Sequence, residues 1–295
     1  MESFKLPDHS TWRNVLSRDG TKLFCREWET QSPAKGTILM VPGLGEHTGR
    51  YVHVGDFFQK AGFNVIGLDV RGQGRSGGTP GYVDRYDQFL EDLRAGIHLV
   101  KAFPLFVLGH SFGGQLALAL AARDEPNIAG YLASGPWLAL TKPPVAWLIG
   151  LASLVNIVYP KCRFPTGIQR SQNSSDEAHL DSLVDLDFNH GFITARTFFE
   201  IIAEARRLLA NPRANAPVLI AQGRPDPVTS VEASTEFYQR LEAPAKELLI
   251  YDGLLHELHN EEERARVLED YLAWIEKTVL LSKEGAEQRA AGTNK

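Results

Sequence analysis

The sequence predicts an α/β fold built on an open, mostly parallel, doubly wound sheet. Short apolar runs alternate with helical patterns along the 295 residues, as they do when a helix follows each strand of a sheet. The runs lack polar alternation, which favours strands that helices cover on both faces. One interval, 137–212, has no clear strand, and we expect it to be an inserted helical cap.

Seven apolar runs are the expected strands. In chain order they are 24–28, 37–41, 64–69, 105–110, 129–134, 217–222 and 246–251. The helix expected over 86–100 places apolar residues three and four positions apart, on one face. The closing helix is expected to start at Asn260, a good N-cap residue, with three glutamates near the positive end of the helix dipole.

These elements predict one domain with an insertion. The core is expected in two parts, 10–136 and 213–281, with the cap between them. The charged, alanine-rich residues 282–295 are expected to form a disordered tail. The amino terminus has no apolar segment of the kind found in signal peptides, so the expected compartment is the cytoplasm.

Charge and cysteine usage limit the expected partners. The formal net charge is −5, from 31 basic and 36 acidic residues, and the sequence has no basic cluster. Nucleic acid is therefore not an expected partner, and a small lipid or ester substrate fits better. The two cysteines, Cys25 and Cys162, are not spaced as metal ligands, and we expect neither a metal nor a cofactor.

The cap contains an uncharged segment, residues 143–160. Its length reaches the lower range of a membrane span, but prolines bracket it and it lies between two strands of one sheet, which favours a cap helix. One interpretation is a buried helix of the cap. Another, compatible with it, is a cap whose apolar side lines an acyl pocket or makes transient contact with a membrane surface. The residues expected to bind the substrate recur at helical spacing: Trp147, Leu148, Leu151 and Leu154.

The stretch LFVLGHSFGGQ carries a serine in a G-x-S-x-G frame. A strand is expected before the frame and a buried helix after it, so Ser111 stands at the apex of a tight turn. Gly109 and Gly113 remove the Cβ atoms that would collide where the backbone crosses itself. The frame alone arises often by chance, but its position makes Ser111 a candidate nucleophile and the N–H of Phe112 a candidate oxyanion donor.

A serine hydroxyl needs a base, and the base needs a carboxylate to orient it. His256 is the candidate base because it lies between the last expected strand and the closing helix, at the edge where strands end. The candidate acid is Asp226, with Asp252 as its rival; a surface histidine and a turn-forming aspartate are the alternatives. The chain order Ser111, Asp226, His256 is that of an α/β-hydrolase triad.

A second oxyanion donor is expected from the loop that follows the strand 37–41. Gly43 and Gly45 let the backbone of this loop approach a ligand closely, and the N–H of Leu44 is the candidate donor. A plain tight turn is the alternative.

Five motifs, in this order, resemble the monoacylglycerol lipase and lysophospholipase-like group of serine α/β-hydrolases: PGLGEHTGRY, GLDVRGQGRSGG, GHSFGG, QGRPDPV and HELHNE. The resemblance covers roughly residues 20–280. It implies an α/β-hydrolase fold, a cap over an acyl tunnel, Leu44 and Phe112 as oxyanion donors, and esters with one long acyl chain as substrates. Two positions depart from the family pattern, because Pro42 and Gln73 stand where the family commonly has histidine.

The leading hypothesis is a serine ester hydrolase that acts on monoacylglycerols or lysophospholipids through an acyl-enzyme on Ser111. Acyl transfer to an alcohol and serine peptidase action use the same triad and remain alternatives. A binding protein that kept the fold is a third alternative, since fold alone does not establish function. A haloalkane dehalogenase is excluded because it needs a carboxylate where Ser111 stands.

Overall fold

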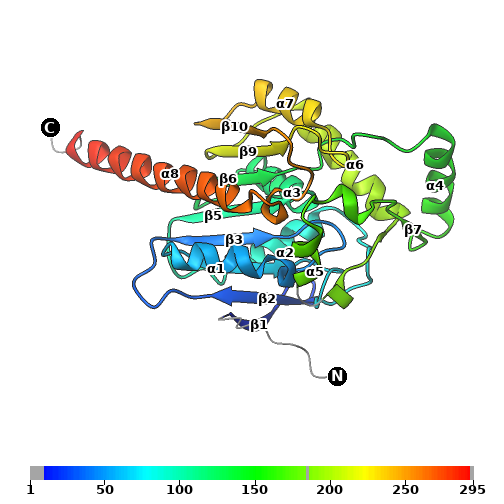
Figure 1. Ribbon diagram of the computed structural model, residues 1–295, viewed down its shortest axis with the longest axis horizontal. Coiled ribbons are helices and arrows are strands. Elements are labelled where there is room, and N and C mark those ends of the chain that lie inside the picture. Colours follow the sequence, from blue (N-terminus) through cyan, green and yellow to red (C-terminus); the bar gives the residue numbers. More distant parts are fainter. Residues whose placement is uncertain (1–9, 184–185, 293–295) are drawn as a thin grey trace.

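The computed structural model describes residues 10–183 and 186–292, and their side chains up to residue 281. Within these residues, eight strands form one sheet (Figure 1). In spatial order the strands are β1 (Thr11–Leu16), β2 (Lys22–Trp28), β4 (Asn64–Asp69), β3 (Thr37–Val41), β5 (Leu105–His110), β6 (Ile128–Ser134), β9 (Val218–Gly223) and β10 (Lys246–Tyr251). Every expected strand is present, within two residues of its expected ends.

The sheet is mostly parallel, as the sequence predicts. Each neighbouring pair from β4 through β3, β5, β6 and β9 to β10 runs parallel, and β2 runs antiparallel to β1 and β4. The register pairs Val41 with Gly109 and His110 with Ser134, so β3, β5 and β6 end at the same edge. Loops at this edge of a parallel sheet are where ligand and catalytic sites form.

Helices cover both faces of the sheet and bury two separate hydrophobic clusters (Figure 1). The helices on one face are α1 (Val52–Lys60) and α8 (Arg264–Gly292). Those on the other face are α2 (Asp87–Ile97), α3 (Phe112–Ala121), α6 (Ala195–Ala210) and α7 (Val231–Arg240). Strands covered on both faces need apolar side chains in both directions, which explains why β3, β5 and β9 consist of buried residues throughout.

The segment between β6 and β9 contains the inserted elements. They are α4 (Ala146–Val158), β7 (Arg163–Pro165), the 3-10 helix Arg170–Gln172, α5 (Glu177–Ser182), the 3-10 helix Leu186–Phe188 and β8 (Phe192–Thr194). The strands β7 and β8 pair antiparallel and have no counterpart among the expected elements, because three residues are too few to show a strand pattern. The next helix, α6, packs Ile201 and Leu208 into the core cluster, so the core resumes before residue 212.

Three further differences concern the chain ends. The edge strand β1 was not expected, because its residues are mostly exposed and show no buried pattern. The helix α8 begins at Arg264, whereas Asn260 ends the 3-10 helix Leu258–Asn260 and donates its amide to Glu257 at 2.6 Å. α8 also continues to Gly292, where a disordered tail was expected from residue 282; alanine, glutamate and arginine favour helix. Residues 293–295 lie outside the described residues.

The helix α4 stands away from the sheet (Figure 1). None of its residues is buried, which contradicts the alternative of a buried cap helix. Among the described residues, no helix is both long enough and apolar enough to cross a membrane. α4 is therefore an apolar helix that the protein itself only partly covers.

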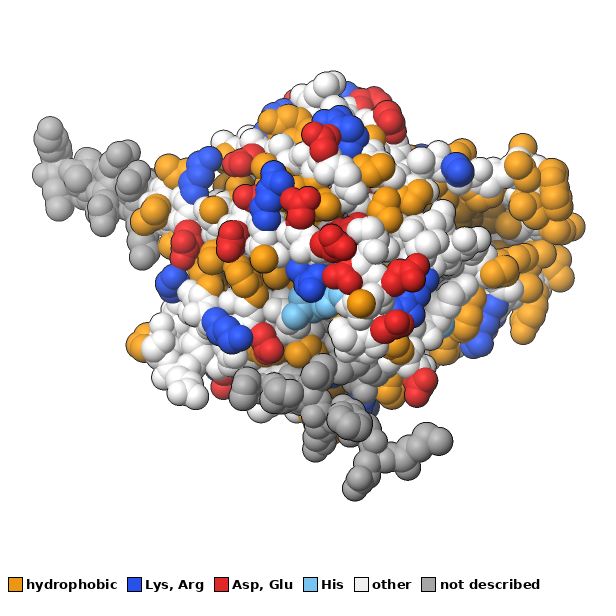
Figure 2. All heavy atoms as spheres, in the orientation of Figure 1, with side chains coloured by type: hydrophobic (Ala, Val, Ile, Leu, Met, Phe, Trp, Pro, Cys, Tyr) orange, Lys and Arg blue, Asp and Glu red, His pale blue; other side chains and the backbone are white. Residues whose placement is uncertain are grey.

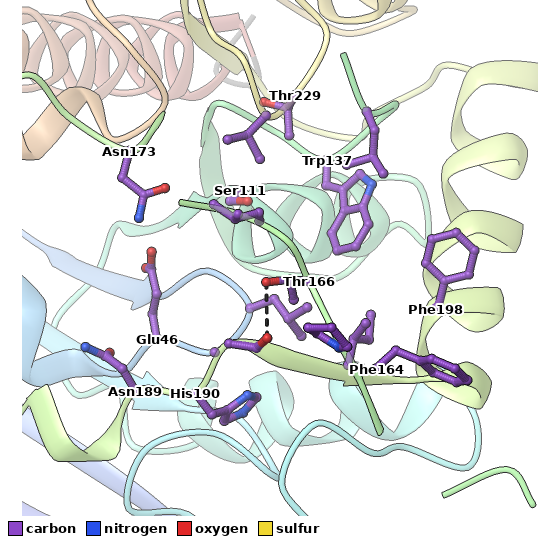
Figure 3. Close-up of a pocket in the computed structure, with 18 of the residues that line it drawn as sticks. Glu46, Ser111, Trp137, Phe164, Thr166, Asn173, Asn189, His190, Phe198 and Thr229 are labelled. Atoms are coloured by element: carbon purple, nitrogen blue, oxygen red, sulfur yellow. Dashed lines mark hydrogen bonds between the residues drawn. The ribbon is translucent and has the colours of Figure 1, made fainter. Parts of the chain in front are cut away.

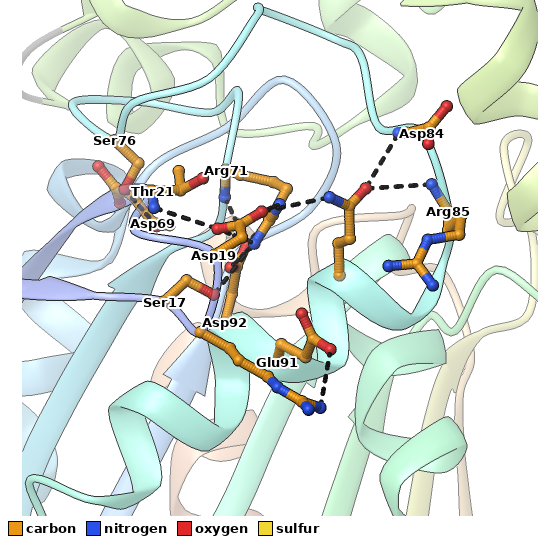
Figure 4. A network of polar contacts seen from close by, with 12 residues as sticks. Ser17, Asp19, Thr21, Asp69, Arg71, Ser76, Asp84, Arg85, Glu91 and Asp92 are labelled. Atoms are coloured by element: carbon orange, nitrogen blue, oxygen red, sulfur yellow. Dashed lines mark hydrogen bonds and ion pairs between the residues drawn. The ribbon is translucent and has the colours of Figure 1, made fainter.

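A buried polar network fixes the loop that follows β4 (Figure 4). The guanidinium of Arg71 donates to Asp92 at 2.6 Å, to Asp19 at 2.6 Å and to Ser17 at 3.0 Å. Arg71 and Asp92 are both buried, and a buried charge is tolerated when it is paired and hydrogen-bonded in this way. The network holds the backbone of the glycine-rich loop from which Gln73 reaches the candidate site.

Candidate active site

Ser111 occupies a strained turn between β5 and α3. Its φ is 53°, a left-handed conformation that non-glycine residues rarely adopt. A Cβ on Gly109 would lie 2.0 Å from the carbonyl oxygen of Gly113, and a Cβ on Gly113 would lie 2.1 Å from that of Val41. Both glycines of the G-x-S-x-G frame are therefore required by close backbone contact, and Ser111 is held at the wall of a cavity.

Asp226 and His256 form a buried pair beside this turn. The Nδ1 atom of His256 donates to Oδ2 of Asp226 at 2.8 Å, and both residues are 4% exposed. Asp226 lies in the loop after β9 and His256 in the loop after β10, so neighbouring parallel strands bring them together. With Nδ1 bound to the carboxylate, Nε2 of His256 is the atom left to act as a base.

The pair shifts both pKa values toward the charged forms. Burial by itself lowers the pKa of His256, but attraction to Asp226 and their hydrogen bond outweigh it, and the net shift is upward. Burial raises the pKa of Asp226, but the charge of His256 and the hydrogen bonds to the carboxylate lower it overall. Asp226 is therefore ionised and ready to stabilise an imidazolium.

Ser111 and His256 both line the same cavity, and Figure 3 shows Ser111 at its wall. Among the described residues, no hydrogen bond joins the Ser111 hydroxyl to the His256 ring. Catalytic hydrogen bonds are often long in the absence of substrate and shorten when substrate binds. The structure thus brings the candidate nucleophile and the candidate base to one cavity.

Asp226 is surrounded by hydrogen-bond donors that the sequence analysis did not identify. Its Oδ1 accepts from the backbone N–H groups of Val228 at 2.8 Å and Thr229 at 3.0 Å. Its Oδ2 accepts from the Thr229 hydroxyl at 2.9 Å and from Nε2 of Gln222 at 2.7 Å, in addition to His256. The rival, Asp252, has a side chain that is 80% exposed and pairs with Arg224 at the surface.

The loop after β3 lies against the cavity with its glycines constrained. The N–H of Gly45 donates to Oε1 of Gln73 at 2.7 Å, and that of Gly43 donates to Glu46 at 3.0 Å. Leu44 lies between them and lines the cavity together with Ser111. Because its two glycine neighbours use their N–H groups for these bonds, the N–H of Leu44 remains the candidate oxyanion donor of this loop.

Phe112 contributes to the site through its backbone alone. Its ring is fully buried and packs against Phe89 with the ring centroids 4.9 Å apart. This packing anchors the first residue of α3, whose N–H is the other candidate oxyanion donor.

The two departures from the family pattern differ in consequence. Gln73 is buried and supplies the acceptor that fixes Gly45, so an amide at this position takes part in positioning the oxyanion loop. Pro42 has no polar side-chain atom, and its backbone carbonyl lies 2.6 Å from the place where a Cβ of residue 113 would stand. Residue 42 therefore meets the serine turn through its backbone.

Two further histidines lie close to the candidate base. The ring centroid of His110 lies 4.7 Å from that of His256 and 4.8 Å from that of His259. Burial lowers the pKa of His110 to about 3 and that of His259 well below its usual value. Both therefore stay uncharged, and the described residues contain no cluster of side chains that could hold a metal ion.

The cavity has a volume of about 620 Å³ and two chemically different sides. Figure 3 shows the aromatic side chains of Trp137, Phe164 and Phe198 on one side of Ser111. The polar side chains of Glu46, Asn173 and Asn189 lie on the other side. Such a cavity suits an amphiphilic molecule whose reacting bond lies between its apolar and polar parts.

Two of the four expected cap residues line this cavity. Leu148 and Leu151 belong to its wall, whereas Trp147 and Leu154 do not and are 69% and 60% exposed. The expectation of one continuous wall from all four is therefore corrected. An α-helix completes one turn every 3.6 residues, so its side chains point to different faces. One face of α4 meets the cavity, and Trp147 and Leu154 lie on a different face.

Comparisons with known proteins support the class that the motifs indicate, the α/β-hydrolases. A family model described as serine aminopeptidase, S33, matches residues 32–263. The monoacylglycerol lipase of Mycolicibacterium smegmatis is 29% identical over 267 residues, which cover 87% of this chain and 93% of that protein. An uncharacterised abhydrolase domain-containing protein of Dictyostelium discoideum is 28% identical over 97% of this chain, which spans 30% of that protein's length.

A solved structure gives the same result for the fold. A soluble variant of monoglyceride lipase from Saccharomyces cerevisiae, in complex with a substrate analogue, matches with a TM-score of 0.81 and 24% identity. The match covers 94% of this chain and 98% of that one. These matches confirm the α/β-hydrolase fold and the resemblance seen in the motifs, and the chain belongs to the serine aminopeptidase S33 family of α/β-hydrolases.

Proposed function

We propose that this protein hydrolyses carboxylic esters with one long acyl chain, as a monoacylglycerol lipase or lysophospholipase. The observation that carries the proposal is the buried Asp226–His256 pair, whose histidine lines the same cavity as Ser111. Figure 3 shows Ser111 between the apolar and the polar side of this cavity. Relatives named monoacylglycerol lipase over most of the chain support it. A Bacillus subtilis relative named phospholipase YtpA, 24% identical, supports the lysophospholipid alternative.

The mechanism would proceed through an acyl-enzyme. His256 takes the proton of Ser111 through Nε2 while the hydroxyl oxygen attacks the ester carbonyl, and Asp226 stabilises the imidazolium. The backbone N–H groups of Leu44 and Phe112 would hold the oxyanion. His256 then gives its proton to the leaving alcohol, and a water that His256 activates releases the fatty acid.

The two sides of the cavity suggest how the substrate lies. The acyl chain would follow the side that holds Trp137, Leu148 and Leu151, where each buried methylene contributes about 0.8 kcal/mol. The alcohol would lie near Glu46. In the described residues, both arginines of the cavity wall, Arg50 and Arg170, are already paired with carboxylates, which favours an uncharged alcohol over a phosphate.

We also propose that α4 makes transient contact with a lipid surface. Ile157 and Val158 are 78% and 76% exposed, and no charged residue interrupts the helix. Figure 2 shows hydrophobic side chains gathered over the end of the molecule where Figure 1 places α4. One face of α4 lines the cavity, so a membrane at its other face would lie close to the cavity that a lipid substrate would occupy.

One substrate panel tests the enzymatic proposal. Purified protein is offered monoacylglycerols, lysophosphatidylcholine, triacylglycerols, nitrophenyl acetate and aminoacyl amides. We expect monoacylglycerols to give the highest kcat/KM and triacylglycerols to be poor substrates, since a cavity of about 620 Å³ has room for one long acyl chain but not for three. A preference for aminoacyl amides would establish the peptidase alternative, and ester synthesis in the presence of an alcohol the acyltransferase alternative.

Vesicle binding tests the surface contact. We expect Ile157→Ser with Val158→Ser to reduce co-flotation with phosphatidylcholine vesicles while hydrolysis of nitrophenyl acetate is retained. The control is Trp12→Ser, which removes another largely exposed apolar side chain, 67% exposed, from the edge strand β1. Equal loss in both variants would mean that α4 has no special role in the contact.

A further inference from the structure

Gln222 is the last residue but one of β9, and it is fully buried beside the candidate pair. On the basis of the proposed function, we infer that Gln222 is a positioning residue, whose amide holds the Asp226 carboxylate in the orientation that His256 requires. It touches neither the cavity nor a reacting atom. It acts through Asp226.

The amide of Gln222 is bound on both of its sides. Its Nε2 donates to Oδ2 of Asp226 at 2.7 Å and to Oγ1 and the carbonyl oxygen of Thr229, each at 3.2 Å. Its Oε1 accepts from the hydroxyl of Ser234, a buried residue of α7, at 2.9 Å. An ionised carboxylate only accepts hydrogen bonds, so the donor Nε2 must face Asp226. The Oε1 atom of the amide then faces Ser234, whose hydroxyl donates to it.

The contact falls on the oxygen that also binds the base. Oδ2 of Asp226 accepts from Gln222, from the Thr229 hydroxyl and from Nδ1 of His256, whereas Oδ1 is held by two backbone N–H groups. Two donors thus flank the bond to His256 and fix its direction. Each of them also draws on the charge that the carboxylate offers to the imidazolium.

Loss of the Gln222 amide therefore has a predictable sign. Without the positive end of the N–H dipole near Oδ2, the carboxylate attracts the proton of His256 more strongly, and the pKa of His256 rises. The other charged or titratable groups near His256 and His110 include Glu46, Glu257, Arg50 and His259, and substitution at residue 222 leaves them in place. The acid limb of activity should move to higher pH.

The first test is Gln222→Met, which keeps the length of the side chain and removes its donor. We expect kcat/KM on the pH plateau to fall about 10- to 100-fold, as when other residues that orient catalytic groups are removed. The acid limb should move upward, and so should the pH at which the downfield proton resonance of the His256 Nδ1–H titrates. A plateau near the wild-type value with an unmoved limb and resonance would overturn the inference.

Gln222→Glu gives an independent signature. Two carboxylates this close cannot both be ionised readily, so residues 222 and 226 would share a proton that replaces the lost N–H donor. As the pH rises, loss of that shared proton leaves two negative charges beside His256, which raise its pKa further, so activity should reach its plateau at higher pH than in Gln222→Met. An acid limb that lies no higher than that of Gln222→Met would contradict the placement of Gln222 against Asp226.

Two comparisons separate this role from folding and from the proposed function. Gln115 is another fully buried glutamine, which donates to backbone carbonyls, and Gln115→Met should leave the acid limb unmoved. Ser234→Ala loosens the Gln222 amide and should give a smaller shift of the same sign, which decides the matter if Gln222→Met does not fold. If the wild type hydrolyses no ester and an organophosphonate does not label Ser111, the proposed function fails; an active wild type with unshifted variants refutes the positioning role alone.

Discussion

Substitution of Asp226 by asparagine tests the assignment of the triad acid most directly. The change preserves size, but the two backbone N–H groups of Val228 and Thr229 require an acceptor at Oδ1. The amide oxygen of the new residue must take that position, so its NH₂ group faces His256. Nδ1 of His256 can then only accept, and the proton moves to Nε2, where the base is needed.

The expected loss follows from this wrong tautomer. Removal of the orienting carboxylate with retained geometry costs about 10⁴-fold in kcat for serine triads, or about 5 kcal/mol of transition-state stabilisation. Asp252→Asn breaks only a surface pair with Arg224, whose side chain is itself mostly exposed. Such pairs contribute about 0–1 kcal/mol to stability and nothing to a distant base, so turnover should stay within about twofold.

The assay is kcat/KM for nitrophenyl acetate, measured for both variants and the wild type at one pH. Thermal unfolding shows whether each variant is folded, because Asp226→Asn also places an extra donor next to Gln222 and Thr229. A larger loss for Asp252→Asn than for Asp226→Asn would refute the assignment of the acid. A small loss for both would mean that His256 needs no carboxylate.

The remaining predictions concern the nucleophile, the base, the acyl pocket and the oxyanion loop. Ser111→Ala should fold and lose at least about a thousandfold in ester hydrolysis, and an organophosphonate should label the wild type at Ser111, as mass spectrometry can verify. Because the pKa of His256 is raised and the base must be neutral, kcat/KM should fall as the pH drops through a value above about 6.5; a pH–rate profile checks this. Leu151→Asp puts a charge on the cavity wall and should weaken hydrolysis of long-chain monoacylglycerols far more than of a two-carbon ester, and equal losses would count against an acyl site there. Gln73→Met leaves the Gly45 N–H without its acceptor, so kcat for nitrophenyl acetate should fall while KM changes little. An effect on KM alone would argue against a role of Gln73 in positioning the loop that carries Leu44.

The parallel core could be predicted from the sequence because its strands are apolar on both faces. β3, β5 and β9 are buried throughout, and such runs stand out in any sequence. The edge strand β1 is mostly exposed on both faces, so its sequence shows no such apolar run. β7 and β8 owe their pairing to each other rather than to burial of a long apolar run.

The candidate site was predictable where local backbone chemistry determines it. The glycines around Ser111 are required because a Cβ on Gly109 or Gly113 would lie 2.0 or 2.1 Å from a backbone carbonyl oxygen. Gln222 was not identified, although a polar residue at the end of the run PVLIAQ is a visible signal. Its role depends on Asp226 and Ser234, which only the folded chain brings within reach.

The helix α4 could be expected from its apolar sequence, but not the division of its residues between two surroundings. Leu148 and Leu151 face the cavity, while Trp147 and Leu154 do not. All four recur at helical spacing, so periodicity alone cannot decide which face meets the rest of the protein. That choice depends on how the flanking segments orient the helix relative to the cavity.

Because the protein covers α4 only partly, a bound acyl chain should change the stability of this helix. A helix of 13 residues is marginal in water by itself and depends on packing of its apolar face. No residue of α4 is buried, so the protein alone supplies little of that packing. An acyl chain in the cavity would lie against Leu148 and Leu151 and act as the missing layer of a hydrophobic core, so that the substrate completes the fold of the cap that binds it.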